Sequence, residues 1–108
     1  MQVISKPWGM EELLVSNENY VVKRLFMKQG CRCSLQYHEH KTETVYVLSG
    51  TLLLHLNGDV TTMSPGDFIT IFPGEVHRME GKEDVSYLES STTELDDVVR
   101  MEDDYGRK

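Results

Sequence analysis

The side chains best suited to chemistry lie close together in one stretch of the chain. Gln36, His38 and His40 alternate along a candidate strand, so their side chains are expected on one face of it. Glu43 follows after a tight turn, at the start of the next apolar run, and can converge on the same point. Converging imidazole, amide and carboxylate groups suit a divalent metal ion.

A second stretch, residues 66–77, ends in another histidine. It reads Gly-Asp-Phe-Ile-Thr-Ile-Phe-Pro-Gly-Glu-Val-His, so His77 follows a Pro-Gly turn. A lone histidine in a β protein, such as His55, is usually a surface or hydrogen-bonded residue. It is the joint spacing of His38 and His77 that indicates a shared site.

The elements that must position these residues are short strands. Hydrophobic periodicity along the chain is mostly two, and Asn57-Gly58 between two apolar runs is the strongest hairpin signal. Short strands without helical spacers favour an all-β sandwich or barrel. Only residues 94–105, with Asp96-Asp97 near their start, suggest a short helix or a clasp. The predicted strands are 20–27, 33–38, 43–48, 51–56, 60–63, 68–72, 76–79 and 85–90.

Length and composition limit the class of protein. The 108 residues form one domain, divided here into an amino-terminal arm (1–19), a barrel (20–90) and an acidic carboxy-terminal segment (91–108). A net charge of −7 opposes binding to nucleic acid, and no apolar run is long enough to cross a membrane. The first seven residues contain no apolar signal-peptide core, so the cytoplasm is the expected compartment.

The two chemical stretches resemble the two motifs of the cupin superfamily. The first motif, Gly-x5-His-x-His-x3–4-Glu-x6-Gly, is matched by residues 30–50, with Gln36 in place of the first histidine. The second, Gly-x5-Pro-x-Gly-x2-His, is matched by residues 66–77, with Phe72 in place of its proline. The resemblance implies a small single-domain cupin, which is a double-stranded β-helix or jelly-roll barrel.

In the cupin pattern the metal ligands fall on Gln36, His38, Glu43 and His77. A set of one amide oxygen, two imidazoles and one carboxylate suits Zn²⁺, Mn²⁺, Fe²⁺, Co²⁺ or Ni²⁺ without choosing among them. His40 is the alternative to Gln36, because it shares the strand face and would form a His-x-His pair with His38. Only two residues separate His40 from Glu43, fewer than the three or four of the cupin motif. His40 is therefore expected to have a catalytic role beside the metal instead.

Further segments resemble the type II mannose-6-phosphate isomerase family, whose domain often forms the carboxy-terminal part of enzymes that also carry a mannose-1-phosphate guanylyltransferase. This resemblance implies an isomerase that interconverts mannose 6-phosphate and fructose 6-phosphate. A chain of this length leaves no room for the guanylyltransferase, so only the isomerase half is expected. The matching segments are Lys-Pro-Trp-Gly at 6–9, Val-Lys-Arg at 22–24, Ser-Leu-Gln-Tyr-His at 34–38, His-Arg at 77–78 and Val-Val-Arg-Met-Glu-Asp-Asp-Tyr-Gly-Arg at 98–107.

Aldose–ketose interconversion through an enediol needs a base for the migrating proton and an electrophile, which a divalent metal can supply. His40 is the first candidate for proton transfer. Lys41, which stands where the family tends to have an arginine, is the second catalytic candidate. Lys23, Arg78 and Arg100 are the candidates for contacts with phosphate or hydroxyl groups.

Two other functions fit parts of the pattern. A non-catalytic cupin that binds a metal, a sugar or another small ligand is favoured by Lys41 and by the absence of a partner domain. An Fe²⁺ oxygenase would use a similar site, but Gln36 and the isomerase-like flanking segments argue against it. Besides a phosphorylated sugar, the expected partner is a second copy of the chain, because small antiparallel barrels often bury an edge strand in a dimer.

Overall fold

The computed structural model describes residues 2–108 and consists of strands, turns and loops, with no helix among those residues. The prediction of an all-β protein is therefore confirmed. None of the described residues belongs to a helix long and apolar enough to cross a membrane. The strands are β1 (Gln2–Lys6), β2 (Gly9–Ser16), β3 (Val21–Met27), β4 (Leu35–Tyr37), β5 (Glu43–Ser49), β6 (Leu52–Leu56), β7 (Asp59–Met63), β8 (Phe68–Ile71), β9 (His77–Gly81), β10 (Val85–Ser91) and β11 (Val99–Glu102).

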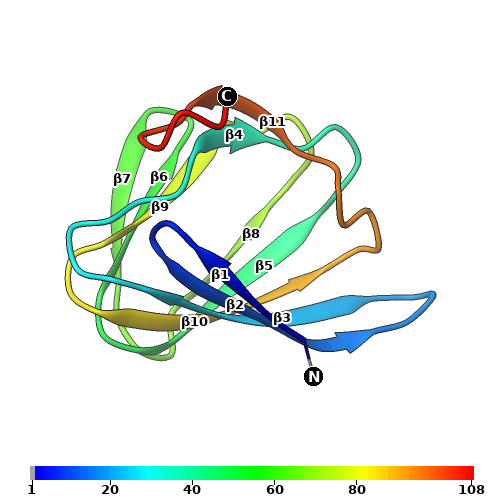
Figure 1. Cartoon of the computed structure of the whole chain (residues 1–108), viewed down its shortest axis with the longest axis horizontal. Helices are drawn as coiled ribbons and strands as arrows, with labels where there is room; N and C mark the ends of the chain where they lie inside the picture. The colour runs from blue at the N-terminus through cyan, green and yellow to red at the C-terminus, as the bar shows by residue number, and fades with distance from the viewer. Residues whose placement is uncertain (1) are drawn as a thin grey trace.

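The strands form two antiparallel sheets that face each other around a common interior (Figure 1). One sheet has the order β1-β2-β3-β10-β5-β8, and the other has the order β11-β4-β9-β6-β7. Strands distant in sequence are neighbours, since β10 lies between β3 and β5 while β9 lies between β4 and β6. Gln36 on β4 therefore pairs with His77 at the start of β9 in the smaller sheet, while Glu43 begins β5 in the larger sheet that faces it.

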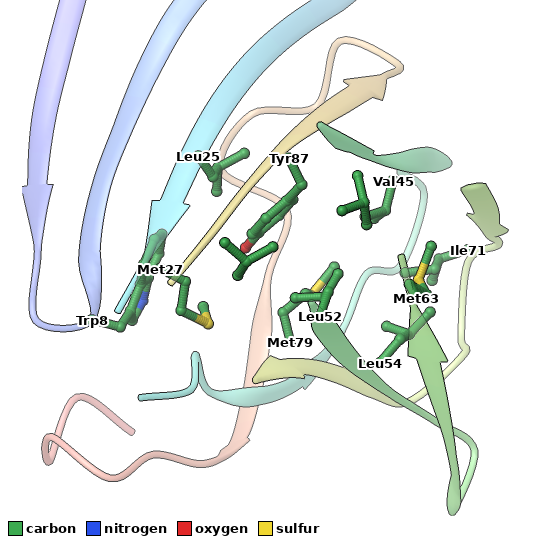
Figure 2. Packing of buried hydrophobic residues seen from close by; sticks show 12 residues of the cluster. Trp8, Leu25, Met27, Val45, Leu52, Leu54, Met63, Ile71, Met79 and Tyr87 are labelled. Carbon is green, nitrogen blue, oxygen red and sulfur yellow. The ribbon is translucent and has the colours of Figure 1, made fainter. Parts of the chain in front are cut away.

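Side-chain alternation determines what enters the interior. In β5, Glu43, Val45 and Val47 are buried, whereas Tyr46 between them is exposed. The apolar members of these inward rows pack into one core (Figure 2). The fully buried core residues include Met27, Val45, Val47, Leu52, Leu54, Ile71 and Val85. The same alternation that buries Val45 thus turns Glu43 to the inside of the barrel.

Three strands fall outside the predicted set. The residues assigned to an amino-terminal arm form β1 and β2, a hairpin that pairs with β3 and extends the larger sheet. The helix suggested for 94–105 is wrong, because Val99–Glu102 pairs with β4 as strand β11. The hairpin predicted at Asn57-Gly58 is confirmed, with positive φ at both residues (50° and 91°).

Candidate metal centre and its cavity

Three of the predicted ligands meet inside the barrel. His38, Glu43 and His77 each offer one ligand atom, and these atoms all lie within 4.8 Å of one another. Glu43 Oε1 lies 2.9 Å from His38 Nε2 and 3.2 Å from His77 Nε2. The three residues are at most 2% exposed, so water does not solvate them.

Both histidine rings are oriented by backbone carbonyls. His38 Nδ1 donates to the carbonyl oxygen of Asp97 at 2.5 Å, and His77 Nδ1 donates to that of Glu75 at 2.9 Å. Because Nδ1 carries the proton in each neutral ring, the Nε2 lone pairs point towards the Glu43 carboxylate. Metal-binding histidines are held in this way by a partner of the other ring nitrogen.

This arrangement fits a cation. Two imidazole lone pairs and a carboxylate oxygen repel one another in a buried space unless a proton or a metal ion lies between them. His77 Nε2 is buried and has no hydrogen-bond partner among residues 2–108. Burial opposes ionisation of Glu43, yet hydrogen bonds from His38 and His77 would hold the pKa of its carboxyl group well below the usual range. Such bonds require a proton on Nε2, and a bound cation would take the place of that proton.

Gln36, the fourth predicted ligand, lies beside the centre. It is directly opposite His77 in the pairing of β4 with β9, and opposite Arg100 in the pairing of β4 with β11. Residues directly opposite in a sheet share a face, so these three side chains form one row. Gln36 Oε1 accepts a hydrogen bond from the Ser34 hydroxyl at 2.6 Å, which leaves one lone pair free. Gln36 as a ligand stays a prediction.

A cavity of about 440 Å³ opens beside the centre, with walls from both sheets and from the segment between β10 and β11. Three of the predicted cationic site residues, Lys23, Lys41 and Arg100, line it. Cationic side chains slightly outnumber carboxylates on its wall, and a bound divalent ion would add to that excess, which favours an anionic ligand. The charged lining consists of Lys6, Lys23, Lys41, Arg100 and Arg107 together with Glu11, Glu43, Glu89 and Asp96.

Lys23 is tied to a carboxylate within this wall. Its Nζ lies 2.5 Å from Glu11 Oε1, and Lys6 Nζ lies 3.6 Å from the other Glu11 oxygen. Burial disfavours both charges, but the ion pair outweighs it, raising the pKa of Lys23 and lowering the pKa of Glu11. Lys23 is thus charged, but part of its charge is already compensated by Glu11.

Glu89 on β10 is a cavity residue that the sequence analysis missed. Its burial, together with the negative charge of Glu43, raises the pKa of its carboxyl group well above the usual value. The signal that could have found it is alternation, because Val85 and Tyr87 on the same strand are buried core residues. The residue two positions further along the strand must face the same side.

Two predicted site residues lie away from the cavity. His40 is exposed and does not line it, because β4 ends at Tyr37 and strand alternation no longer applies to the turn that follows. Arg78 follows His77 on β9 and therefore points to the opposite face. Its Nε donates to the carbonyl oxygen of Cys33 at 3.1 Å, and its Nη2 lies 3.6 Å from Asp104.

Comparison with known proteins agrees with this geometry. Residues 1–103 match the family model described as "Mannose-6-phosphate isomerase C-terminal". The mannose-1-phosphate guanylyltransferase ManC of Salmonella typhimurium is 38% identical over 109 residues, which cover 96% of this chain and 23% of the relative. The mannose-1-phosphate guanylyltransferase of Escherichia coli is 35% identical with the same coverage. The chain therefore spans about a quarter of the length of these curated relatives.

Solved structures with similar architecture show the fold. An RmlC-like cupin from Shewanella frigidimarina superposes with a TM-score of 0.80 at 15% sequence identity. The match covers 87% of this chain and 85% of that chain. The expectation of a small cupin, a double-stranded β-helix, is confirmed.

Proposed function

This chain belongs to the mannose-6-phosphate isomerase C-terminal family, and we propose that it is a metal-dependent isomerase that interconverts mannose 6-phosphate and fructose 6-phosphate. The observation that carries the proposal is the convergence of His38, Glu43 and His77, the first two of which line a cavity where cationic side chains slightly outnumber carboxylates. The curated relatives are named as guanylyltransferases and are matched over only 23% of their length. The proposal therefore does not include guanylyltransferase activity.

We propose that His38, Glu43 and His77 hold a divalent metal ion, with Gln36 as a fourth ligand. When bound, the ion would supply an electrophile that polarises the carbonyl and hydroxyl oxygens of the sugar. The protein's part is to orient both Nε2 atoms towards the ion and to supply the Glu43 carboxylate. The Nδ1 hydrogen bonds to backbone carbonyls fix the orientation of both rings.

Arg100 and Lys41 are the proposed contacts for the phosphate group. Arg100 Nε is buried and has no hydrogen-bond partner among the described residues, so a donor on the cavity wall remains available. A guanidinium can grip phosphate with two parallel hydrogen bonds, whereas the Lys41 ammonium acts as a point charge. Lys23, already paired with Glu11, is better suited to a sugar hydroxyl. The cavity volume lies within the usual range of about 300–1,000 Å³ for small-molecule sites.

The proton that migrates between C1 and C2 needs a carrier inside the cavity. His40 does not line the cavity, so another group must take the role first predicted for it. Glu89 and Lys41 both line the cavity wall that contains Glu43. We assign the proton transfer to the Glu89 carboxyl group, whose pKa is raised above the usual value. Its ionised form would take the proton from C2, and the acid form so produced would return it to C1. Lys41 would then hold the developing negative charge.

A cytoplasmic homodimer is part of the proposal. β8 is an edge strand of the larger sheet, and Phe68 on it is 67% exposed. Phe72 just after the strand and Tyr46 on the neighbouring strand are also exposed. Large exposed aromatic side chains next to an unpaired strand edge support a contact with a second copy. Light scattering should give twice the chain mass, and Phe68→Glu should give the monomer.

A ligand-binding cupin without catalysis is the second candidate, favoured by the position of His40 outside the cavity. One experiment separates the two. The protein is loaded in turn with Zn²⁺, Mn²⁺, Fe²⁺, Co²⁺ and Ni²⁺ and incubated with mannose 6-phosphate in D₂O, and the C2 proton is followed by NMR. The isomerase proposal predicts loss of the C2 proton signal and appearance of fructose 6-phosphate. Binding of the sugar phosphate without exchange under every metal would contradict it and support the ligand-binding function.

A further inference from the structure

We propose that Asp97 is a positioning residue of the metal centre, which it holds in place from the carboxy-terminal segment. The inference rests on the proposed function, because it concerns the same metal ligands. Asp97 lies in the connection between β10 and β11, far along the chain from the loop that joins β4 to β5. Sequence analysis considered it only as the start of a helix, which the structure does not contain.

The side chain of Asp97 binds three consecutive backbone N–H groups of that loop. Asp97 Oδ1 accepts from Glu39 at 3.0 Å, while Oδ2 accepts from His40 at 2.7 Å and from Lys41 at 2.9 Å. These N–H groups lie between the end of β4 and the start of β5, where no ladder satisfies them. Successive N–H groups that converge on one anion form a concave site for a carboxylate.

The backbone of the same residue holds a metal ligand. The Asp97 carbonyl oxygen accepts the Nδ1 hydrogen bond of His38 at 2.5 Å. One residue therefore fixes the tautomer of the His38 ring through its carbonyl group and the following turn through its carboxylate. Because that turn joins His38 to Glu43, Asp97 sets the distance between two of the three ligands.

Among residues 2–108, the other hydrogen bonds to this loop hold its two ends. The Gly74 N–H donates to the carbonyl oxygen of His38 at 2.8 Å, and the Thr42 N–H donates to the Thr92 hydroxyl at 3.1 Å. The middle of the loop, residues 39–41, depends on the Asp97 carboxylate. Lys41 also reaches the cavity from this part of the loop. Loss of the carboxylate should therefore disturb the ligand geometry and one cavity wall while leaving the apolar core intact.

The test compares Asp97→Asn with wild type, using Co²⁺ as a spectroscopic probe. The amide retains one acceptor oxygen and the backbone carbonyl, but loses the second carboxylate acceptor. We expect Co²⁺ affinity to fall by about 10- to 100-fold, the usual cost of losing a group that orients a metal ligand. We also expect a changed visible absorption spectrum at saturating Co²⁺, because residues 39–41 lose a carboxylate acceptor and the spacing between His38 and Glu43 is then less firmly fixed.

Glu94→Gln is the matched control, since it removes the same charge from the same segment at a residue whose side chain accepts a hydrogen bond from the Thr92 hydroxyl, which an amide oxygen can also accept. The control should keep the wild-type affinity and spectrum. The positioning role of Asp97 would be overturned if Asp97→Asn bound Co²⁺ with wild-type affinity. It would also be overturned if the Co²⁺ spectrum of Asp97→Asn equalled that of Glu94→Gln. A wild-type protein that binds no Co²⁺ would instead contradict the metal site of the proposed function.

A second measurement on the wild-type chain covers the case in which Asp97→Asn does not fold. Hydrogen exchange should show the amides of residues 39–41 protected, and Co²⁺ should slow their exchange further, together with the amides of 94–98. Exchange of 39–41 at the rate of free amides, or no effect of a bound Co²⁺ on them, would overturn the inference.

Discussion

Along β5, Glu43, Val45 and Val47 all face the barrel interior, yet they meet different surroundings. Val45 and Val47 are packed among other apolar side chains in the core, where each buried group stabilises the fold by leaving water. Glu43, two residues before Val45, meets His38 and His77 instead. Burying a carboxylate costs free energy that only a proton or a metal ion beside it offsets.

The difference shows how one strand pattern supplies both stability and a site. Alternation selects the side chains that enter the barrel, and distance along the strand decides whether they reach the core or the cavity. A polar residue in an inward row, such as Glu43 or Glu89, is therefore a candidate for function. A change in the core should affect folding, whereas a change at the centre should affect metal binding.

The largest expected effect is on metal binding by Glu43→Gln. The substitution replaces the only carboxylate of the three-residue cluster with a neutral amide, so binding of divalent metal should no longer be detectable by calorimetry. The substitution also removes a buried charge, and this limits its effect on the metal-free protein. The free energy of unfolding should therefore change by less than it does when a core side chain is truncated. A variant that keeps wild-type metal affinity would show that Glu43 is not a ligand.

The next effect is on stability, measured by urea unfolding of Leu54→Ala. Leu54 is fully buried in the core, and its truncation should lower the free energy of unfolding by about 2–5 kcal/mol. The folded variant should still bind one metal ion per chain. Loss of metal binding in the folded variant would mean that the core and the centre are not separable.

A smaller effect is expected for Arg100→Ala. Removing a charge-assisted contact to phosphate should raise KM for mannose 6-phosphate about 10-fold or more, at about 1.5–3 kcal/mol per contact, with kcat less affected. Arg78→Ala is the control, because Arg78 does not line the cavity. Equal changes in KM for the two variants would argue against Arg100 as the phosphate contact.

The smallest effect is on the pH dependence of the thermal midpoint in the acid range. Bonds from Arg107, with burial opposing them, lower the pKa of Asp103 to about 2. An aspartate with a lowered folded-state pKa stabilises the fold above its unfolded pKa of about 3.9, and this contribution is lost as pH falls towards 2. Asp103→Asn should therefore reduce the thermal midpoint slightly at pH 7 and by a smaller amount at pH 2, where the folded-state carboxyl group is about half protonated. A reduction of equal size at both pH values would contradict this account.

The part of the fold that follows local rules could be predicted from the sequence. The strands that alternate strongly and the turn at Asn57-Gly58 were both found, since each depends only on neighbouring residues. His38, Glu43 and His77 were identified because two gapped motifs fix their positions in the barrel. β11 lies outside the predicted strands because its pairing with β4 is long-range. β1 and β2 form a local hairpin, but most of their residues are not buried, so they show no clear alternation of buried and exposed side chains.

The missed parts of the site have similar physical reasons. His40 was assigned to the cavity by extending strand alternation beyond the end of β4, where the chain turns. Arg78 lies next to a ligand in sequence but on the other face of β9. Asp97 acts on residues 39–41 through hydrogen bonds between distant parts of the chain, which no local pattern reveals.

The most direct test of the metal centre is anomalous diffraction from crystals of the protein loaded with cobalt or zinc. The account predicts one strong peak about 2.0–2.3 Å from His38 Nε2, His77 Nε2 and a carboxylate oxygen of Glu43, with Gln36 Oε1 completing the set. A peak elsewhere on the protein, or no peak in crystals grown with excess metal, would contradict the claim that this end of the barrel is built to hold a metal ion.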